Sequence, residues 1–398
     1  MNGIKNIKFI KWSNLIKLKI KKKIFYWAPF LTPIATPKAV INSAYSLQKY
    51  SNEFDCSIIN FFGEFNIFKK DIVNKNIKIY NSSFNILRKY LPFKGKIKSR
   101  FSFLIIFILS FLPLRKLLSE ERPDYLIVQL ITSLPMFLVL IFNFNTKFIL
   151  RISGIPRVSF FRKLLWKIAL KKFYLITCPT ESTMQYIKSL NIVDDDKIKV
   201  LFDPIIEVKK IKSETNKKNN TISHNNYCLA VGRLTKQKNF IFLCKAFKKV
   251  VTKYPNAKLL IAGDGEDKEK IDSYIIKNKL EENIITLGYI KNIFPLMYGA
   301  KLFILSSLWE DPGFVLIEAS FCRTPTLTSN CKTGPIELIK DKKNGLVFES
   351  NNLESFFKKF EEFNKIEKIS DLKLNNLRMI KKFTLFQHYK SFNRMLSY

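Results

Sequence analysis

Short apolar runs and segments with helical spacing alternate along most of the chain. In the C-terminal half, each run rich in Leu, Ile, Val and Phe is followed by an amphipathic segment. Short buried strands separated by helices are typical of a parallel sheet covered by helices on both faces. The predicted strands are 227–231, 258–262, 284–287, 302–306, 326–328 and 346–348, and the predicted helices are 239–252, 267–278, 313–322 and 351–363.

The first half shows the same alternation less regularly, and it predicts a second α/β domain. A polar segment rich in Lys and Asn separates the halves and is interpreted as a linker. We therefore expect domains at 1–205 and 227–379, joined by a linker at 206–226. Two such domains place a ligand crevice at the carboxyl ends of their strands. The predicted strands of the first half are 24–28, 57–61, 77–80, 125–130, 147–151 and 174–178.

Two further segments bear on membrane association. Residues 1–23 contain eight Lys and no acidic residue, and they form either an amphipathic membrane-surface helix or a solvated tail. Pro29 interrupts the apolar stretch 24–31, which favours a first core strand over a signal peptide. The run 101–114 is shorter than the roughly 20 residues that a membrane span needs. It predicts a buried or membrane-facing helix, and hence a peripheral protein.

Composition narrows the class of protein. The 398 residues suffice for two domains, and 47% hydrophobic residues exclude general disorder. The net charge of +36 indicates a polyanionic partner: nucleic acid, an acidic membrane face or a phosphorylated ligand. The six cysteines form no CxxC pair and only two histidines occur, so the spacings of zinc and iron–sulfur sites are missing. A reducing cytoplasm is the simplest inference.

Two loops of the second domain carry candidate chemistry. In the first, Gly232 permits a sharp turn after a strand and places Arg233 and Lys238 near a helix N-terminus. A guanidinium and an ammonium there suit a pyrophosphate, although they could also be surface charges. The second loop follows 302–306 and contains Glu310.

The helix after the second loop contains a carboxylate in an apolar environment. Pro312 suits its first turn, and Gly313 lets backbone amides approach a ligand. Glu318 lies further along, between apolar residues, where a carboxylate is costly unless a partner satisfies it. A vicinal diol would supply two donors; a buried Lys or a backbone amide is the alternative partner.

The segment 227–349 resembles the donor-binding half of the retaining glycosyltransferases of family 4, the group 1 glycosyltransferases. The resemblance implies the GT-B fold, in which two Rossmann-like domains face a central crevice. By the same resemblance, 380–398 returns as a final helix to the first domain, so His388 is expected at an interface rather than as a base. The matching elements are Gly232-Arg233-Leu234 with Lys238, Tyr254-Pro255-Asn256-Ala257, Gly263-Asp264-Gly265-Glu266, Leu287-Gly288-Tyr289, Glu310 with Glu318, Thr324-Pro325 and Asn344-Gly345-Leu346-Val347.

The resemblance also implies roles for these residues. Arg233 and Lys238 would hold the diphosphate of a nucleotide sugar and stabilise it as the leaving group. Glu318 would bind the ribose diol, and Glu310 would contact the transferred sugar. No metal or other cofactor is required. The catalytic candidates are Glu310, Lys238 and Arg233, and the other donor-binding candidates are Gly313, Phe314, Val315, Glu318, Tyr289 and Ile290.

The chain departs from the family pattern in its first domain. Family members often carry Gly-Gly after the first strand, whereas residues 31–37 read LTPIATP here. Many use a histidine near the reacting sugar, but only His224 and His388 occur. Gln129 and the Arg151–Gly154 loop could face the crevice, and a plain strand-end turn is the competing interpretation of both. The run Asp194-Asp195-Asp196 is interpreted as a solvated turn rather than a metal site.

The resulting hypothesis is a retaining hexosyl- or N-acetylhexosaminyltransferase. It would move sugar from a nucleotide-diphosphate donor to a lipid-linked or saccharide acceptor bound mainly by the first domain. The basic, apolar first domain places it at the cytoplasmic membrane face, in assembly of a surface polysaccharide or lipopolysaccharide. A catalytically inactive relative that binds sugar nucleotide or membrane is the alternative. A nucleic-acid-binding protein would explain the charge but not Glu318.

Overall fold

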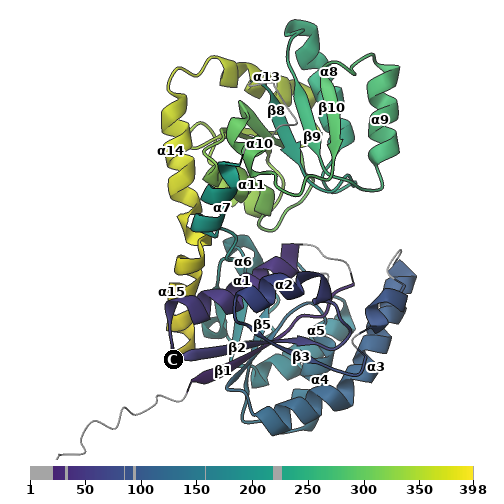
Figure 1. The fold of residues 1–398 in the computed structure, drawn as a ribbon, viewed down its shortest axis with the longest axis vertical. Helices are drawn as coiled ribbons and strands as arrows, with labels where there is room; N and C mark the ends of the chain where they lie inside the picture. The colour runs from purple at the N-terminus through teal and green to yellow at the C-terminus, as the bar shows by residue number, and fades with distance from the viewer. Residues whose placement is uncertain are drawn as a thin grey trace, which may run out of the picture.

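The computed structural model describes residues 21–31, 35–84, 86–92, 96–156, 158–217 and 226–397, which form two α/β domains (Figure 1). The N-terminal domain contains a parallel seven-stranded sheet in the order β3-β2-β1-β4-β5-β6-β7. Its strands are β1 Lys22–Trp27, β2 Phe54–Asn60, β3 Lys78–Asn81, β4 Tyr125–Val128, β5 Lys147–Arg151, β6 Leu175–Cys178 and β7 Ile198–Val200.

The C-terminal domain contains a parallel six-stranded sheet in the order β10-β9-β8-β11-β12-β13. Its strands are β8 Cys228–Val231, β9 Leu259–Ala262, β10 Ile284–Gly288, β11 Leu302–Leu305, β12 Thr326–Ser329 and β13 Leu346–Phe348. Every strand predicted above is present, with ends that differ by a few residues. Both sheets have the Rossmann strand order, so the predicted fold of two Rossmann-like domains is confirmed.

Helices cover both faces of each sheet and thereby bury most of the strand residues. In the N-terminal domain they are α1 Ala35–Tyr50, α2 Lys69–Asn74, α3 Lys96–Glu121, α4 Ser133–Ile141, α5 Phe160–Ala169 and α6 Glu181–Ser189. The later helices are α7 Val208–Thr215, α8 Phe240–Lys253, α9 Lys268–Lys277, α10 Phe294–Gly299, α11 Phe314–Phe321, α12 Gly334–Leu338, α13 Leu353–Asn364, α14 Ile369–Met379 and α15 Leu385–Leu396.

The Rossmann order determines where ligands can bind. In each parallel sheet the order of the strands reverses between two neighbours, β1 and β4 in the first domain and β8 and β11 in the second. The loops after these strands diverge and leave a crevice at the carboxyl edge of the sheet. The two loops that carry candidate chemistry follow β8 and β11, so the fold brings them together at this point.

The polar segment between the domains is not wholly unstructured. Residues 208–215 form α7, and Ile211 is buried in the core of the C-terminal domain beside Leu296 and Met297 of α10. Two apolar residues, Val208 and Ile211, in a mostly basic stretch were too weak a signal for a helix. His224 and the rest of that segment to 225 lie outside the described residues, as does the N-terminal arm 1–20.

The chain crosses between the domains twice, and the crossings lie side by side. The backbone N–H groups of Ile205 and Ile206 both donate to the carbonyl of Phe383, at 2.9 and 3.0 Å. After this point α15 packs against α1 of the N-terminal domain, as Figure 1 shows at the left of the molecule. His388 of α15 is buried, with one ring nitrogen 2.8 Å from Ser43 Oγ and the other 2.7 Å from the carbonyl of Phe202.

Further polar contacts join the domains at the crevice. The Glu337 carboxylate in α12 accepts hydrogen bonds from the backbone N–H groups of Glu181 (3.0 Å) and Ser182 (2.7 Å). These groups lie at the N-terminus of α6, where a carboxylate is favoured by the helix dipole. Thr183 Oγ1 donates to Asp311 at 2.6 Å. The arrangement of the two domains is therefore held by charge-assisted hydrogen bonds as well as by the paired crossings.

Helix α3 is longer than the apolar run that predicted it. It continues past Arg115 and Lys116 to Glu121, and by length and composition Lys98–Glu121 could cross a membrane. One face, which includes Ile106, Leu114 and Leu118, is buried in the domain core. Only 28% of the apolar stretch of the helix as a whole is buried. The helix thus lies along the domain, with one face buried and the other uncovered.

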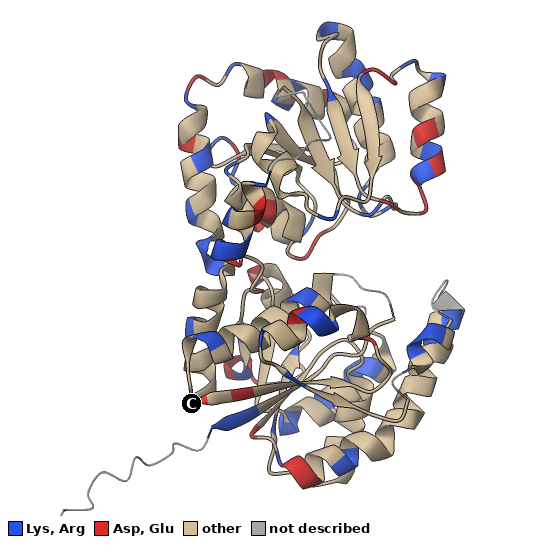
Figure 2. Ribbon diagram, viewed as in Figure 1, with Lys and Arg blue, Asp and Glu red and all other residues tan. Residues whose placement is uncertain are grey.

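The charged residues and the cysteines lie where a large folded core would place them. Lys and Arg are spread over the helices of both domains rather than gathered on one element (Figure 2). All six cysteines are buried and free, as expected for small core residues. Burial raises the pKa of the Cys178 thiol to about 12, so it is protonated at neutral pH.

Acidification is expected to destabilise the protein through His388. Burial, with a smaller effect of nearby Arg151, lowers the pKa of His388 to about 3, whereas an unfolded histidine titrates near 6.5. Between these values the unfolded state binds a proton that the folded state does not, so stability falls as the pH drops, by at most about 1.4 kcal/mol per pH unit. The Tm of the wild type should therefore fall more steeply between pH 6.5 and 5 than that of His388→Gln. Parallel curves for the two proteins would contradict this account.

Candidate active site

The loop after β8 is shaped by close contacts between backbones. A Cβ on Gly263 would lie 1.8 Å from the Gly232 carbonyl oxygen, so only glycine allows the loops after β8 and β9 to pack this closely. The Gly232 N–H donates to the carbonyl of Ala262 at 3.0 Å. The Lys238 side chain folds back over this turn, with its Cε 3.1 Å from where a Cβ on Gly232 would stand.

Lys238 meets the loop after β11 in a buried ion pair. Its Nζ contacts Glu310 Oε1, which also accepts a hydrogen bond from Ser307 Oγ at 2.7 Å. The side chains of Lys238 and Glu310 are 12% and 7% exposed. Ser306 Oγ donates to the Lys238 carbonyl at 2.8 Å and ties the loops together a second time. The structure thus brings together two of the three predicted catalytic residues, and pairs them with each other.

The start of α11 presents backbone donors beside this pair. Gly313 has φ 94°, in the left-handed region that favours glycine, and precedes the first helical residue Phe314. A Cβ at Gly313 would lie 3.6 Å from Glu310 Cβ, so the helix begins directly against the buried carboxylate. The first N–H groups of a helix have no acceptor within it. The amides of Gly313, Phe314 and Val315 stand at this start of α11, where Gly313 adjoins Glu310.

Glu318 lies in the next turn of α11. Burial raises the pKa of its carboxyl group, and the positive charges of Lys38 and Lys238 oppose that shift. Lys38 belongs to the first turn of α1 in the N-terminal domain, so α1 faces this site across the crevice. Among the described residues the structure shows no hydrogen bond or ion pair to the Glu318 carboxylate. The alternative of a Lys or amide partner is thus not found there.

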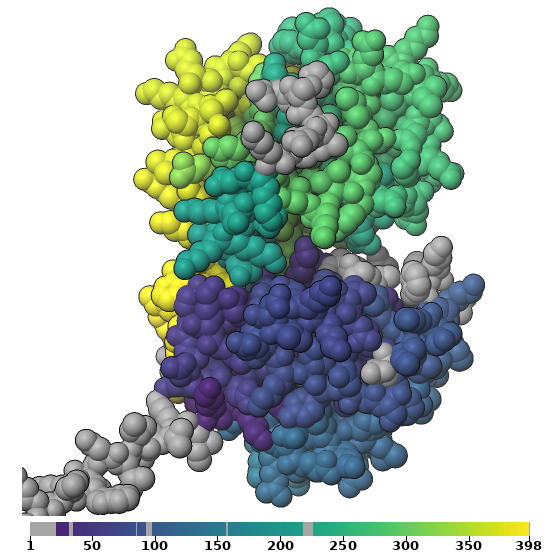
Figure 3. Space-filling view, viewed as in Figure 1, coloured from purple at the N-terminus to yellow at the C-terminus, as the bar shows by residue number. Residues whose placement is uncertain are grey.

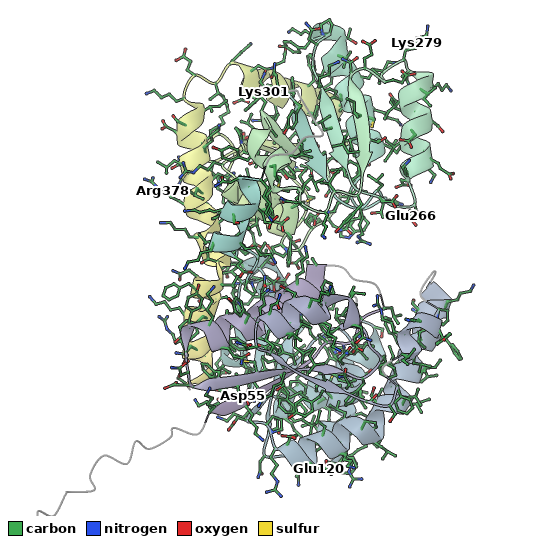
Figure 4. All side chains as sticks on the ribbon, viewed as in Figure 1. Asp55, Glu120, Glu266, Lys279, Lys301 and Arg378 are labelled. Atoms are coloured by element: carbon green, nitrogen blue, oxygen red, sulfur yellow. The ribbon has the colours of Figure 1, made fainter. Side chains whose placement is uncertain are left out.

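The remaining donor-side candidates lie on the same edge of the sheet. The Gly288 carbonyl accepts a hydrogen bond from the Gly263 N–H at 2.8 Å, which fixes the loop with Tyr289 and Ile290 beside the loop after β9. The Tyr289 side chain is 78% exposed and Arg233 is also exposed. Glu266, labelled in Figure 4, lies at the edge of the C-terminal domain that faces the N-terminal domain. In the space-filling view the boundary between the domains is indented on the right (Figure 3).

The residues of the N-terminal domain that were predicted to face the crevice lie in different environments. Gln129 is buried directly after β4, at the strand where the order reverses. Arg151 is buried and donates to the Leu201 carbonyl at 2.7 Å and to the Asp203 carboxylate, so its guanidinium serves the core rather than the crevice. Gly154 of the same loop does face the other domain: a Cβ there would be 3.9 Å from Asp311.

The acidic run is the solvated turn that the sequence predicts. Asp194, Asp195 and Asp196 are exposed, and Asp195 pairs with Lys188 at 3.3 Å. Among the residues that the structure describes, no three His, Cys, Asp or Glu side chains are grouped so that they could hold a metal ion. Of the loop that replaces Gly-Gly, residues 32–34 lie outside the described ranges.

The sequence analysis missed Asp311, Glu337 and Lys38. Burial raises the pKa of Asp311 to about 6, despite the hydrogen bond from Thr183, and its Oδ1 atom has no hydrogen-bond partner in the described structure. Asp311 follows Glu310 in the loop, and this adjacency was the only signal in the sequence. Its role at the interface, like those of Glu337 and Lys38, depends on the other domain.

Comparison with known proteins identifies this arrangement. Residues 212–378 match the family model described as "Glycosyl transferases group 1". An uncharacterized glycosyltransferase of Methanocaldococcus jannaschii is 34% identical over 243 residues, which cover 56% of this chain and 60% of that protein. The N-acetylgalactosamine-N,N'-diacetylbacillosaminyl-diphospho-undecaprenol 4-alpha-N-acetylgalactosaminyltransferase of Campylobacter jejuni is 34% identical over 131 residues, 33% of this chain and 35% of that enzyme. Less than two thirds of each relative is therefore matched.

The whole fold has a solved counterpart. A glycosyltransferase from Rickettsia africae superposes with a TM-score of 0.74 at 17% sequence identity, covering 95% of this chain and 98% of that one. At this identity the likeness concerns the fold alone. The C-terminal half thus matches the model of the group 1 glycosyltransferases, and the two domains have the GT-B fold.

Proposed function

We propose that the protein transfers a hexosyl or N-acetylhexosaminyl group from a nucleotide-diphosphate sugar to an acceptor hydroxyl, with retention of anomeric configuration. The observation that carries the proposal is the buried Lys238–Glu310 pair beside the unpartnered Glu318 carboxylate. A cation and two carboxylates at the point where the strand order reverses match the three parts of such a donor: diphosphate, sugar and ribose.

The diphosphate of the donor would compete with Glu310 for Lys238. A diphosphate carries more negative charge than one carboxylate, so Lys238 would move onto it, joined by Arg233 from the exposed side of the loop. Glu310 is then released to accept hydrogen bonds from the hydroxyls of the sugar. Lys238 and Arg233, with the amides at the start of α11, would neutralise the leaving group, and no metal takes part in the proposed reaction.

Glu318 would recognise the ribose. An ionised carboxylate offers two oxygens to the two hydroxyl donors of a diol, and the half-buried position of Glu318 strengthens such bonds. Tyr289 and Ile290, on the neighbouring loop, would flank the base. The exposed ring of Tyr289 is free to stack on it.

In the proposal, the anomeric configuration is retained because the acceptor hydroxyl attacks the face from which the leaving group departs. The bond between the anomeric carbon and the diphosphate oxygen breaks, and the acceptor oxygen bonds to the same face of that carbon. The acceptor proton passes to the departing diphosphate oxygen, so no enzymic nucleophile is needed. Arg233 and Lys238 would hold that oxygen in place during the transfer.

The acceptor would be lipid-linked or a saccharide, bound mainly by the N-terminal domain at the cytoplasmic membrane face. The C. jejuni relative is named for a diphospho-undecaprenol acceptor, and the uncovered apolar face of α3 supports a peripheral location. Assembly of a surface polysaccharide or lipopolysaccharide is the proposed setting. Nucleic acid has no part in it.

A transfer assay tests the proposal. The purified protein is incubated with a panel of labelled nucleotide-diphosphate sugars and an extract of membrane lipids, and labelled product and its anomeric configuration are measured. Lys238→Gln should lower the rate at least about 100-fold, since it removes the cation that stabilises the leaving group. Lys236→Gln, which removes an exposed lysine from the same loop, should leave it unchanged. Nucleotide binding with no transfer of any sugar would instead favour a catalytically inactive relative.

The ribose contact can be tested separately. The wild type should bind a nucleoside diphosphate about tenfold or more tightly than its 2′-deoxy form, because the deoxy form leaves a carboxylate oxygen of Glu318 unpaired. Glu318→Gln should reduce this preference, while its Tm confirms that it folds. Calorimetric titration of both ligands into both proteins gives the four affinities. An equal preference in wild type and variant would exclude Glu318 from the ribose site.

A further inference from the structure

The N-terminal domain contains a cavity of about 600 Å³. Its inner wall is formed by the loops after β1 and β4, including Phe30, Leu31 and Ile131, at the carboxyl edge of the sheet. Its outer wall is formed by α3 and α5, which contribute Phe103 and Trp166. The cavity therefore lies between the carboxyl edge of the sheet, where the crevice is, and helices α3 and α5.

The lining suits a hydrocarbon chain. Most of the wall is aromatic or aliphatic, with hydroxyls of Thr132 and Ser133 and the Arg162 side chain among it. The volume lies within the range of pockets that bury small organic ligands. An apolar chain would lose its contact with water against the ten apolar residues of the wall, and the polar groups that it would have to avoid are those of Thr36, Ser99, Thr132, Ser133 and Arg162.

The helices around this cavity expose apolar side chains that a soluble protein ordinarily buries. On α5, Phe160 and Phe161 are 78% and 81% exposed, and Leu164 and Ile168 follow at helical spacing. Helix α4 contacts both α3 and α5. The exposed apolar residues of these three helices, named here the α3–α5 face, are Phe101, Phe103, Leu104, Ile108, Leu112, Phe137, Ile141, Phe160, Phe161, Leu164 and Ile168.

Positive charge accompanies the α3–α5 face. Helix α5 carries Arg162, Lys163 and Lys167 and has no acidic residue. On α3, Lys98 and Arg100 lie near the cavity, whereas Glu120 lies at the end farthest from the C-terminal domain (Figure 4). An apolar surface interleaved with cations is complementary to a bilayer with anionic headgroups. A neutral protein partner would not account for this charge.

We infer that the cavity binds the hydrocarbon chain of a lipid-linked acceptor, and that the α3–α5 face rests on the anionic bilayer from which that lipid comes. The inference rests on the proposed function for the presence of an acceptor, and it selects a lipid-linked acceptor over a free saccharide. The lipid would leave the bilayer beside α5, place its chain between α3 and α5, and present its polar end at the crevice. Glycosyl transfer would then occur at the membrane surface without a spanning helix.

The cavity is tested by a chain probe that needs neither donor nor acceptor. Stearate carrying a doxyl spin label quenches tryptophan fluorescence at short range, and Trp166 lines the cavity. We expect saturable quenching in the full-length wild type and its reduction by more than half in Trp166→Phe. Ser133→Phe, which fills the cavity from an exposed position, should weaken probe binding at least tenfold, while the matched Ser189→Phe should not. Tm measurements show whether the variants fold.

Either of two results would overturn the cavity site: no saturable quenching in the wild type, or equal probe affinity in Ser133→Phe and Ser189→Phe. Nucleoside diphosphate titration of the same proteins reports on the donor site independently. Failure of the proposed function would therefore appear as lost nucleotide binding with quenching intact.

The α3–α5 face is tested with vesicles of phosphatidylcholine alone or with 30% phosphatidylglycerol. Full-length protein should bind the anionic vesicles, and Phe160→Ser/Phe161→Ser should bind them at least tenfold more weakly with the N-terminal arm unchanged. Val73 and Ile276 are also exposed but lie on other helices, and Val73→Ser/Ile276→Ser serves as the matched control. Equal vesicle binding by the two double variants would contradict the proposal. So would a change from dimer to monomer in Phe160→Ser/Phe161→Ser, which would make the face a contact between copies.

Discussion

The candidate site depends on one electrostatic constraint: the charges of Lys238 and Glu310 must be paired because both are nearly buried. Loss of one partner from a buried pair costs about 3–5 kcal/mol, so the free protein holds the loops after β8 and β11 together through this contact. Any anion that draws Lys238 away must compensate for that loss. The site is thereby selective for ligands that bring both a strong anion for Lys238 and hydroxyl donors for Glu310.

The domain arrangement places a second set of groups around this pair. The paired crossings at Ile206 and Phe383 fix one side of the molecule, and the bond between Thr183 and Asp311 reaches the loop that carries Glu310. Lys38 brings α1 within electrostatic range of Glu318. The N-terminal domain thus contributes charge near Glu318 and contains a cavity of its own, which in the proposed function would serve the donor and the acceptor respectively. Donor and acceptor would meet where these contributions converge.

The sequence predicted the strands well because parallel buried strands are short apolar runs bounded by loops, whereas the apolar runs at 101–114 and 133–141 formed helices. The sequence also predicted that Lys238, Glu310 and Gly313 lie close together, since the strand order reverses between β8 and β11 and the loops after these two strands meet there. It could not reveal that Lys238 and Glu310 pair with each other. Asp311, Lys38 and the cavity were missed for a common reason: each depends on packing between elements that are distant in sequence.

The central claim is that Lys238 exchanges Glu310 for the diphosphate of a donor. Calorimetric titration of nucleoside diphosphates into wild type, Lys238→Gln and Glu310→Gln tests it most directly. Glu310→Gln frees Lys238 and removes a repelling charge, so it should bind the nucleotide at least as tightly as the wild type. Lys238→Gln should bind it at least about tenfold more weakly, a difference of about 1.4 kcal/mol. Equal affinities in Lys238→Gln and wild type, or weaker binding in Glu310→Gln, would contradict the exchange.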